Sequence, residues 1–256
     1  MIVEIEKSKY GSIRKFMEKD VGRNYFILLG LTSKKEIYDR IYGEYHGSQL
    51  RAVLLKRKSG TLQFYAPGEF DLDAFVEIIS SLEYNSLIGA KSYCDRFLNQ
   101  GIFGRVEDGA YISKLDRDYK IKPFEIRSKI RDINLDDLDE IVELYKKVFK
   151  SFSPKEVMEE KLKSKRGRGL CIEKDGKILS LAQTDFETSE AAVIVGVATS
   201  PDHKFKGLAT ECLKLLSSRL LNEEKDIYLQ YDNLDAGKIY ERIGFKAIDQ
   251  VMHYIR

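Results

Sequence analysis

The stretch 193–222 constrains the fold most strongly, because it reads as a strand, a short loop and a helix in immediate succession. Its first part, 193–199, is apolar and rich in β-branched residues, which favours a buried strand. Pro201 ends that strand, since proline has no N–H to donate to a sheet. From Leu208 the apolar residues recur at helical spacing, which predicts an amphipathic helix that begins near Gly207.

The N-terminus of this predicted helix is suited to binding a diphosphate. The first backbone N–H groups of a helix have no partner inside it, and the aligned peptide dipoles place about half a positive charge there. Small residues at Gly207 and Ala209 let an anion approach the backbone, and Lys204 and Lys206 add positive charge. The glycine patterns of Rossmann and P-loop sites do not occur in this loop.

The order of residues in the loop resembles motif A of the GNAT superfamily of acyl-CoA-dependent N-acetyltransferases. That motif reads Q/R-x-x-G-x-G/A, and residues 204–209 fill it with Lys204 in place of glutamine or arginine. Lysine keeps the positive charge but lacks the planar fork of donors that arginine offers.

A second block, 233–245, strengthens the resemblance. The family pattern N-x-x-A-x-x-x-Y-x-x-x-G-F is filled at every specified position, by Asn233, Ala236, Tyr240, Gly244 and Phe245. The residues alone predict a helix that is capped near Asn233 and stopped by Gly244. The resemblance therefore implies an α/β (α+β) fold, with a GNAT-like mixed, splayed β-sheet flanked by helices.

The resemblance also implies which residues form an acetyl-CoA site. In the family, the cofactor lies in a V-shaped gap between the motif A strand and the next strand. Tyr240 is expected to protonate the departing CoA thiolate, with a core tyrosine as the alternative. The residues expected to bind the cofactor are Val197, Ala198, Thr199, Lys204, Phe205, Lys206, Gly207, Leu208, Ala209, Thr210 and Asn233. For Asn233 the alternative is a plain helix cap.

A general base is harder to assign. Some family members carry a glutamate within the motif A strand, but 193–196 contains no carboxylate. Asp185, Glu187 and Glu190 come just before it and are expected to be solvated in a turn. Base catalysis through water, or an amine already deprotonated in bulk, stays open. So does a non-catalytic protein that binds acyl-CoA as a sensor or scaffold.

Two further features lie near the expected site. The basic run 161–168 follows a predicted helix and is expected to be a solvated loop, with attraction of an anionic acceptor as the alternative. His203, beside the diphosphate loop, is expected at the surface, with a phosphate contact as the alternative.

The chain is expected to form two domains, 1–122 and 123–256, separated by a charged stretch. The second carries both motifs. The first has a similar order of expected strands and helices without either motif, which predicts a degenerate GNAT-like domain; an unrelated α+β domain is the alternative. Within it, helices are expected over 33–42 and from Asp71, which is placed as an N-cap.

Composition narrows the expected partners. The 43 Lys and Arg residues nearly balance the 41 Asp and Glu residues, which gives no support for a nucleic-acid or membrane partner, or for a tandem-domain enzyme acting with tRNA. Three widely spaced cysteines predict neither a disulfide framework nor a metal site. Without an apolar leader or span, a cytoplasmic protein is expected. The expected acceptor is a small-molecule or peptide amine, and a homodimer stays open.

Overall fold

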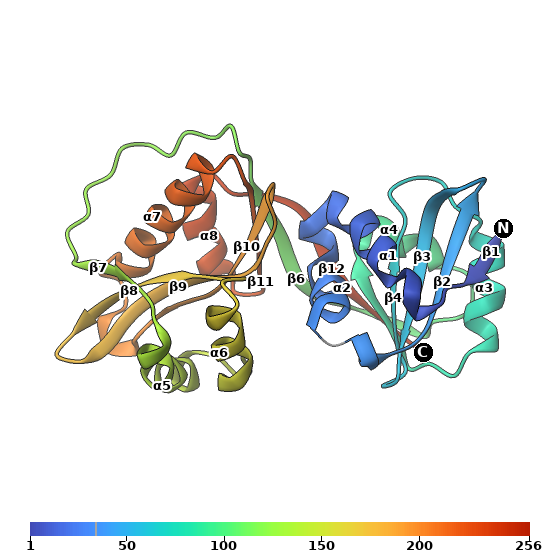
Figure 1. Cartoon of the computed structure of the whole chain (residues 1–256), viewed down its shortest axis with the longest axis horizontal. Coiled ribbons are helices and arrows are strands. Elements are labelled where there is room, and N and C mark those ends of the chain that lie inside the picture. Colours follow the sequence, from blue (N-terminus) through green and yellow to red (C-terminus); the bar gives the residue numbers. More distant parts are fainter. Residues whose placement is uncertain (34) are drawn as a thin grey trace. The chain divides into compact units, whose positions relative to one another are not determined.

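The computed structural model describes residues 1–33 and 35–256 and divides into two compact units. Unit 1 comprises Met1–Ile112 together with Ala247–Arg256, and unit 2 comprises Ser113–Lys246. This division differs from the expected one in two ways: the boundary lies at 112/113 rather than 122/123, and residues 247–256 belong with the first half of the chain (Figure 1).

The same order of strands and helices occurs twice along the chain. The first series is β1 (Ile2–Glu4), α1 (Tyr10–Met17), α2 (Val21–Ser33), β2 (Tyr38–His46), β3 (Gln49–Arg57), β4 (Thr61–Tyr65), α3 (Leu72–Ser81), β5 (Ser86–Ala90), α4 (Lys91–Cys94) and β6 (Arg105–Leu115). The second is β7 (Ile130–Asp132), α5 (Leu138–Val148), α6 (Lys155–Lys163), β8 (Gly169–Lys174), β9 (Lys177–Glu187), β10 (Ala191–Thr199), α7 (Leu208–Asn222), β11 (Asp226–Tyr231), α8 (Leu234–Ile243) and β12 (Lys246–Ile255). The match, element by element, supports a duplicated fold.

The sheet of unit 1 contains the strands β1-β2-β3-β4-β5-β12 in that order, with β4 parallel to β5 and the other pairs antiparallel. Neighbouring residues of β4 point to opposite faces. Phe64 packs its ring against Phe75 of α3 at 5.1 Å, whereas Tyr65 packs against Phe16 of α1 at 5.1 Å. Helices therefore cover both faces of this sheet.

Of the two helices named above for this unit, the one from Asp71 is confirmed and the one over 33–42 is wrong. Asp71 caps α3, and its side chain accepts a hydrogen bond from the N–H of Ala74 at 3.1 Å. The range 33–42, in contrast, contains the start of strand β2, and residue 34 lies outside the described residues. Tyr38 shows why: its buried hydroxyl donates to Gln63 Oε1 on β4, a long-range contact that local spacing does not reveal.

The sheet of unit 2 contains β11-β10-β9-β8-β7, with β10 parallel to β11 and the other pairs antiparallel. Leu170 and Ile172 of β8 pack in one core with α7 and α8, and Cys171 between them packs in another with α5 and α6. The two helix pairs thus cover opposite faces, as Figure 1 shows. Asp175 and Gly176, both at positive φ, form the turn between β8 and β9.

The last strand of each series crosses into the other unit. β12 follows α8 of unit 2 but pairs with β5 of unit 1, where the Tyr254 hydroxyl donates to the Asp95 carboxylate. The end of β6 belongs to unit 2, where Leu115 joins the core. Just beyond it, Arg117 forms an ion pair with Asp226 at 3.1 Å. Each unit is completed by residues from the other half of the chain.

The three cysteines are free and buried. Burial raises the pKa of the Cys171 thiol to about 11 and that of Cys212 to about 12, so neither is a reactive thiolate at neutral pH. Within the described residues, no helix combines the length and the apolar character needed to cross a membrane.

Candidate active site

The sheet of unit 2 opens between β10 and β11. Residues 191–194 of β10 pair with 226–229 of β11, and the pairing stops there although both strands continue. The two strands therefore diverge over their second halves, which leaves backbone groups of β10 without a ladder partner on that side. This is the splay that the resemblance implies.

A β-bulge lies where the strands diverge. Gly196 and Val197 together oppose the single residue Ala182 on β9. Gly196 has a φ of +60°, and a Cβ there would lie 1.9 Å from the hydroxyl oxygen of Tyr145. Only glycine meets both conditions, so the bulge and the close approach of Tyr145 depend on this residue.

The direction of the backbone groups after the bulge alternates along β10. The N–H of Ser200 donates to a carbonyl of β9 at 2.8 Å, so Ala198, two residues earlier, also faces β9. The carbonyl of Ala198 accepts from Ser180 Oγ at 2.8 Å. Of the three strand residues expected to bind a cofactor, Val197 and Thr199 therefore present their backbone groups to the open edge.

Helix α7 begins beside this edge with an uncapped N-terminus. Gly207 is the N-cap in the left-handed region, at φ +80°, and has no side chain that could accept from the first turn. The first intrahelical bond is donated by Glu211, so the N–H groups of Leu208, Ala209 and Thr210 have no acceptor within the helix. A Cβ on Gly207 would meet nothing within 4 Å. The site is open to an anion.

The loop before α7 presents charge and one strained aromatic residue. Lys204 and Lys206 are exposed, and neither forms an ion pair with any residue that the structure describes. Phe205 is fully exposed and has a φ of +62°, which is unfavourable for a bulky side chain. His203 has a buried Nδ1 that finds no hydrogen-bond partner among residues 1–33 and 35–256.

Tyr240 lies on α8, with its ring in the core. The ring packs against Tyr231 at 5.4 Å and Phe245 at 6.2 Å between centroids. No residue in the described part of the chain hydrogen-bonds to the hydroxyl. Burial raises the pKa of Tyr240 to about 12, so the hydroxyl keeps its proton at neutral pH.

Asn233 is the N-cap of α8. Its side-chain oxygen accepts from the N–H of Asp235 at 2.9 Å and from that of Ala236 at 3.5 Å. The side-chain oxygen of Asn233 therefore caps the helix, and a role of Asn233 in cofactor binding stays a prediction.

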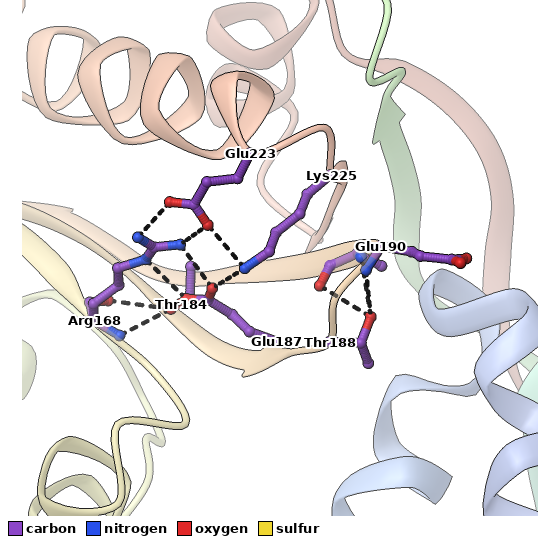
Figure 2. Close-up of polar contacts among 8 residues, drawn as sticks. Arg168, Thr184, Glu187, Thr188, Glu190, Glu223 and Lys225 are labelled. Carbon is purple, nitrogen blue, oxygen red and sulfur yellow. Dashed lines mark hydrogen bonds and ion pairs between the residues drawn. The ribbon is translucent and has the colours of Figure 1, made fainter.

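The acidic residues before β10 are placed differently from the expectation. Asp185 and Glu187 lie on β9 rather than in the turn, and both are largely buried in ion pairs. Glu187 Oε2 forms ion pairs with Arg168 Nη2 at 2.8 Å and with Lys225 Nζ at 2.7 Å. Figure 2 shows this closed cluster, with the exposed Glu190 in the turn beyond it. The expectation of solvated carboxylates is correct for Glu190 and wrong for the other two.

The basic run 161–168 is likewise only partly solvated. Lys161 is buried, because it occupies a position on the inner face of α6. Arg168 is bound bidentately by Glu187 and by Glu223 at the end of α7. Arg168 also contributes, with Lys165, to the lining of a cavity of about 540 Å³ near the start of β8. The run therefore fixes structure as well as presenting charge.

A mixed sheet that opens beside an uncapped helix N-terminus defines a class of α/β proteins that can bind an anionic ligand along a strand edge. The chain matches the GNAT acetyltransferase family over residues 91–254, and it belongs to that family. No curated protein matches the sequence.

Solved structures of low sequence identity share the fold over the whole chain. An acetyltransferase of the GNAT family from Colwellia psychrerythraea has a TM-score of 0.71 at 14% identity, covering 100% of this chain and 99% of its own. A GCN5-related N-acetyltransferase from Sphaerobacter thermophilus has a TM-score of 0.66 at 13% identity, covering 98% and 94%. A tandem GNAT protein from the clavulanic acid biosynthesis pathway has a TM-score of 0.65 at 12% identity, and the match covers 100% of this chain and 98% of that protein. The first half of the chain thus also has a GNAT-like fold.

Sequence reasoning missed the contacts that shape the bulge. An isolated glycine inside a strand pattern, as at Gly196, is a signal for a bulge. Lys161 follows Met158 at helical spacing on the buried face of α6, which distinguishes it from the exposed lysines of the same run.

Proposed function

We propose that the chain is an N-acetyltransferase that transfers an acetyl group from acetyl-CoA to a primary amine of a small molecule or peptide. The observation that carries this proposal is the opening of the sheet after Ile194 of β10, directly followed by the uncapped N-terminus of α7. An elongated ligand with a diphosphate at one end fits this arrangement. Membership of the GNAT acetyltransferase family supports the same assignment.

The residues of the open edge have separate roles in this proposal. The carbonyl of Val197 and the backbone groups of Thr199 hydrogen-bond to the pantetheine arm, as a further strand would. Lys204 and Lys206 bind the diphosphate together with the amides of residues 208–210. The acyl end of the ligand then lies further back along β10, at the bulge.

Tyr240 assists the departure of the CoA thiolate. A CoA thiol, with a pKa of about 8.5, is a stronger acid than Tyr240 with its pKa of about 12. Tyr240 therefore donates a hydrogen bond to the forming thiolate and passes a proton to it. Tyr240 recovers that proton from the ammonium group that forms when the amine attacks the thioester. The net proton comes from the acceptor amine. An amine that reaches the site in its neutral form therefore needs no carboxylate base on β10.

A second candidate function is a non-catalytic acyl-CoA-binding sensor or scaffold. It is favoured by one observation: Asp185 and Glu187, the carboxylates on the strand next to β10, are both held in ion pairs with cationic side chains.

Calorimetric titration with acetyl-CoA and with CoA, followed by thiol release against a panel of amines, tests the proposal. Micromolar binding with thiol release in the presence of an amine is the expected result. Binding without thiol release for any amine would favour the sensor. Absence of binding to either ligand would reject both functions.

A further inference from the structure

Three buried side chains form a hydrogen-bonded chain that ends on the bulge of β10. Lys161 Nζ donates to Gln183 Oε1 at 2.9 Å, and Gln183 Nε2 donates to the hydroxyl of Tyr145. Tyr145 in turn donates to the carbonyl oxygen of Gly196 at 3.0 Å. These three residues are only 2% to 6% exposed. Every donor points the same way, from a cation towards one peptide group.

The protein makes room for each member of this chain with a glycine. A Cβ at Gly167 would lie 2.7 Å from the side chain of Lys161, and one at Gly169 would lie 2.7 Å from that of Gln183. A Cβ at Gly196 would collide with Tyr145. The three side chains are therefore enclosed closely by backbone, which fixes their rotamers and the direction of their hydrogen bonds.

The positive charge of Lys161, the first member of the hydrogen-bonded chain, is balanced by a carboxylate but not removed. Asp185 lies 3.2 Å from Lys161 Nζ and stabilises its positive charge. Burial acts in the opposite direction and lowers the pKa of Lys161 from its ordinary value. At the other end, burial raises the pKa of Tyr145, so its hydroxyl remains a donor to Gly196.

Fixing the carbonyl of Gly196 also fixes the N–H of Val197, because both belong to one planar peptide and point in opposite directions. The carbonyl points towards Tyr145, so the N–H points away from Tyr145, and the alternation along β10 directs this N–H to the open edge. Aligned hydrogen bonds polarise one another, so a peptide whose carbonyl accepts from this chain is a stronger donor at its N–H.

We propose that Tyr145 is a positioning residue, which acts with Gln183 and Lys161 to aim and polarise the Val197 N–H at the carbonyl oxygen of the bound acyl thioester. That oxygen gains negative charge when an amine attacks, so a donor fixed in advance lowers the barrier. The inference rests on the proposed function, because it requires an acyl thioester at the bulge.

The carbonyl stretch of bound acetyl-CoA tests the inference without an acceptor amine. Difference infrared spectra are recorded with acetyl-CoA carrying ¹³C at the thioester carbonyl, for the wild type and for Tyr145→Phe. A hydrogen bond to the carbonyl moves its band to lower frequency. The expected result is a clear shift in the wild type and a reduced shift in Tyr145→Phe, with the affinity for CoA itself unchanged.

Two further variants separate positioning from general loss of structure. Tyr38→Phe is the matched control, because Tyr38 is an equally buried tyrosine in unit 1 whose hydroxyl likewise contacts a glutamine side chain and a backbone carbonyl. It is expected to leave the band unchanged. Lys161→Met removes the cation but keeps Tyr145, and an intermediate shift is expected; this variant decides the question if Tyr145→Phe does not fold.

With an amine that supports thiol release, Tyr145→Phe is expected to lower kcat about tenfold at an unchanged KM for acetyl-CoA. Identical carbonyl bands in the wild type, Tyr145→Phe and Lys161→Met would overturn the inference and leave the proposed function standing. Failure of the wild type to bind acetyl-CoA would instead reject the proposed function, and the inference with it.

Discussion

The hydroxyl of Tyr240 is the one polar atom of a side chain that is otherwise part of the core. Tyr240→Phe is expected to leave the affinity for acetyl-CoA nearly unchanged and to lower kcat about 100-fold, because only the donor to the thiolate is lost. Steady-state kinetics and calorimetry together check this. Since the pKa of Tyr240 is raised to about 12, ionisation of this residue should cause no loss of wild-type rate up to pH 10. An unchanged kcat in the variant would remove Tyr240 from the mechanism.

Gly207 combines a left-handed backbone with open space above the helix N-terminus. Gly207→Glu is expected to weaken acetyl-CoA binding by about 100-fold or more, because it places a negative charge where the diphosphate binds. Gly176→Glu is the matched control: Gly176 also has a positive φ and no atom within 4 Å of a Cβ, but it lies in the β8–β9 turn. Calorimetry should show full affinity in the control. Equal affinities of the two variants would contradict the assignment of the loop.

At the scale of elements, the ion-pair cluster of Figure 2 joins the end of α7 to β8 and β9. Arg168 lowers the pKa of Glu223 to about 2, so the folded state binds its proton less readily than the unfolded chain. The stabilisation is therefore complete above the ordinary carboxyl pKa and is lost as the pH falls towards 2.

Glu223→Gln tests this linkage. Because its side chain is 38% exposed, solvent screening limits its contribution to less than about 1 kcal/mol, and the Tm at pH 7 should fall by about 1 to 3 °C. The difference from wild type should narrow below about pH 5 and vanish near pH 2. Glu190→Gln, at the exposed turn, should not change the Tm at any pH. A difference that persists undiminished at pH 2 would contradict the linkage.

The elements that sequence reasoning predicted correctly are those specified by neighbouring residues. The loop before α7 and the cap at Asp71 depend on contacts within a few positions. The elements it missed depend on distant partners. The hydrogen-bonded chain from Lys161 through Gln183 to Tyr145 joins three separate elements, and no local sequence pattern predicts these contacts.

On the scale of the whole molecule, the exchange of strands between the units, with β12 in unit 1 and the end of β6 in unit 2, limits which fragments of the chain can be isolated. A fragment covering 123–256, the domain expected from the sequence, lacks Leu115 and Arg117 and retains β12 without its partner β5. Such a fragment exposes an apolar strand edge. We expect it to aggregate or to melt without cooperativity, whereas the full chain melts cooperatively; circular dichroism and light scattering check this. A soluble, cooperatively melting fragment would show that the exchange is dispensable.

The pairing of β12 with β5 also has a consequence for biosynthesis. The ribosome produces the first half of the chain well before residues 247–256, and at about 5–20 residues per second the delay is on the order of ten seconds. Throughout that time the nascent first unit has an uncovered strand edge at β5. A protein built this way would depend on chaperones that shield that edge until synthesis has supplied the last strand.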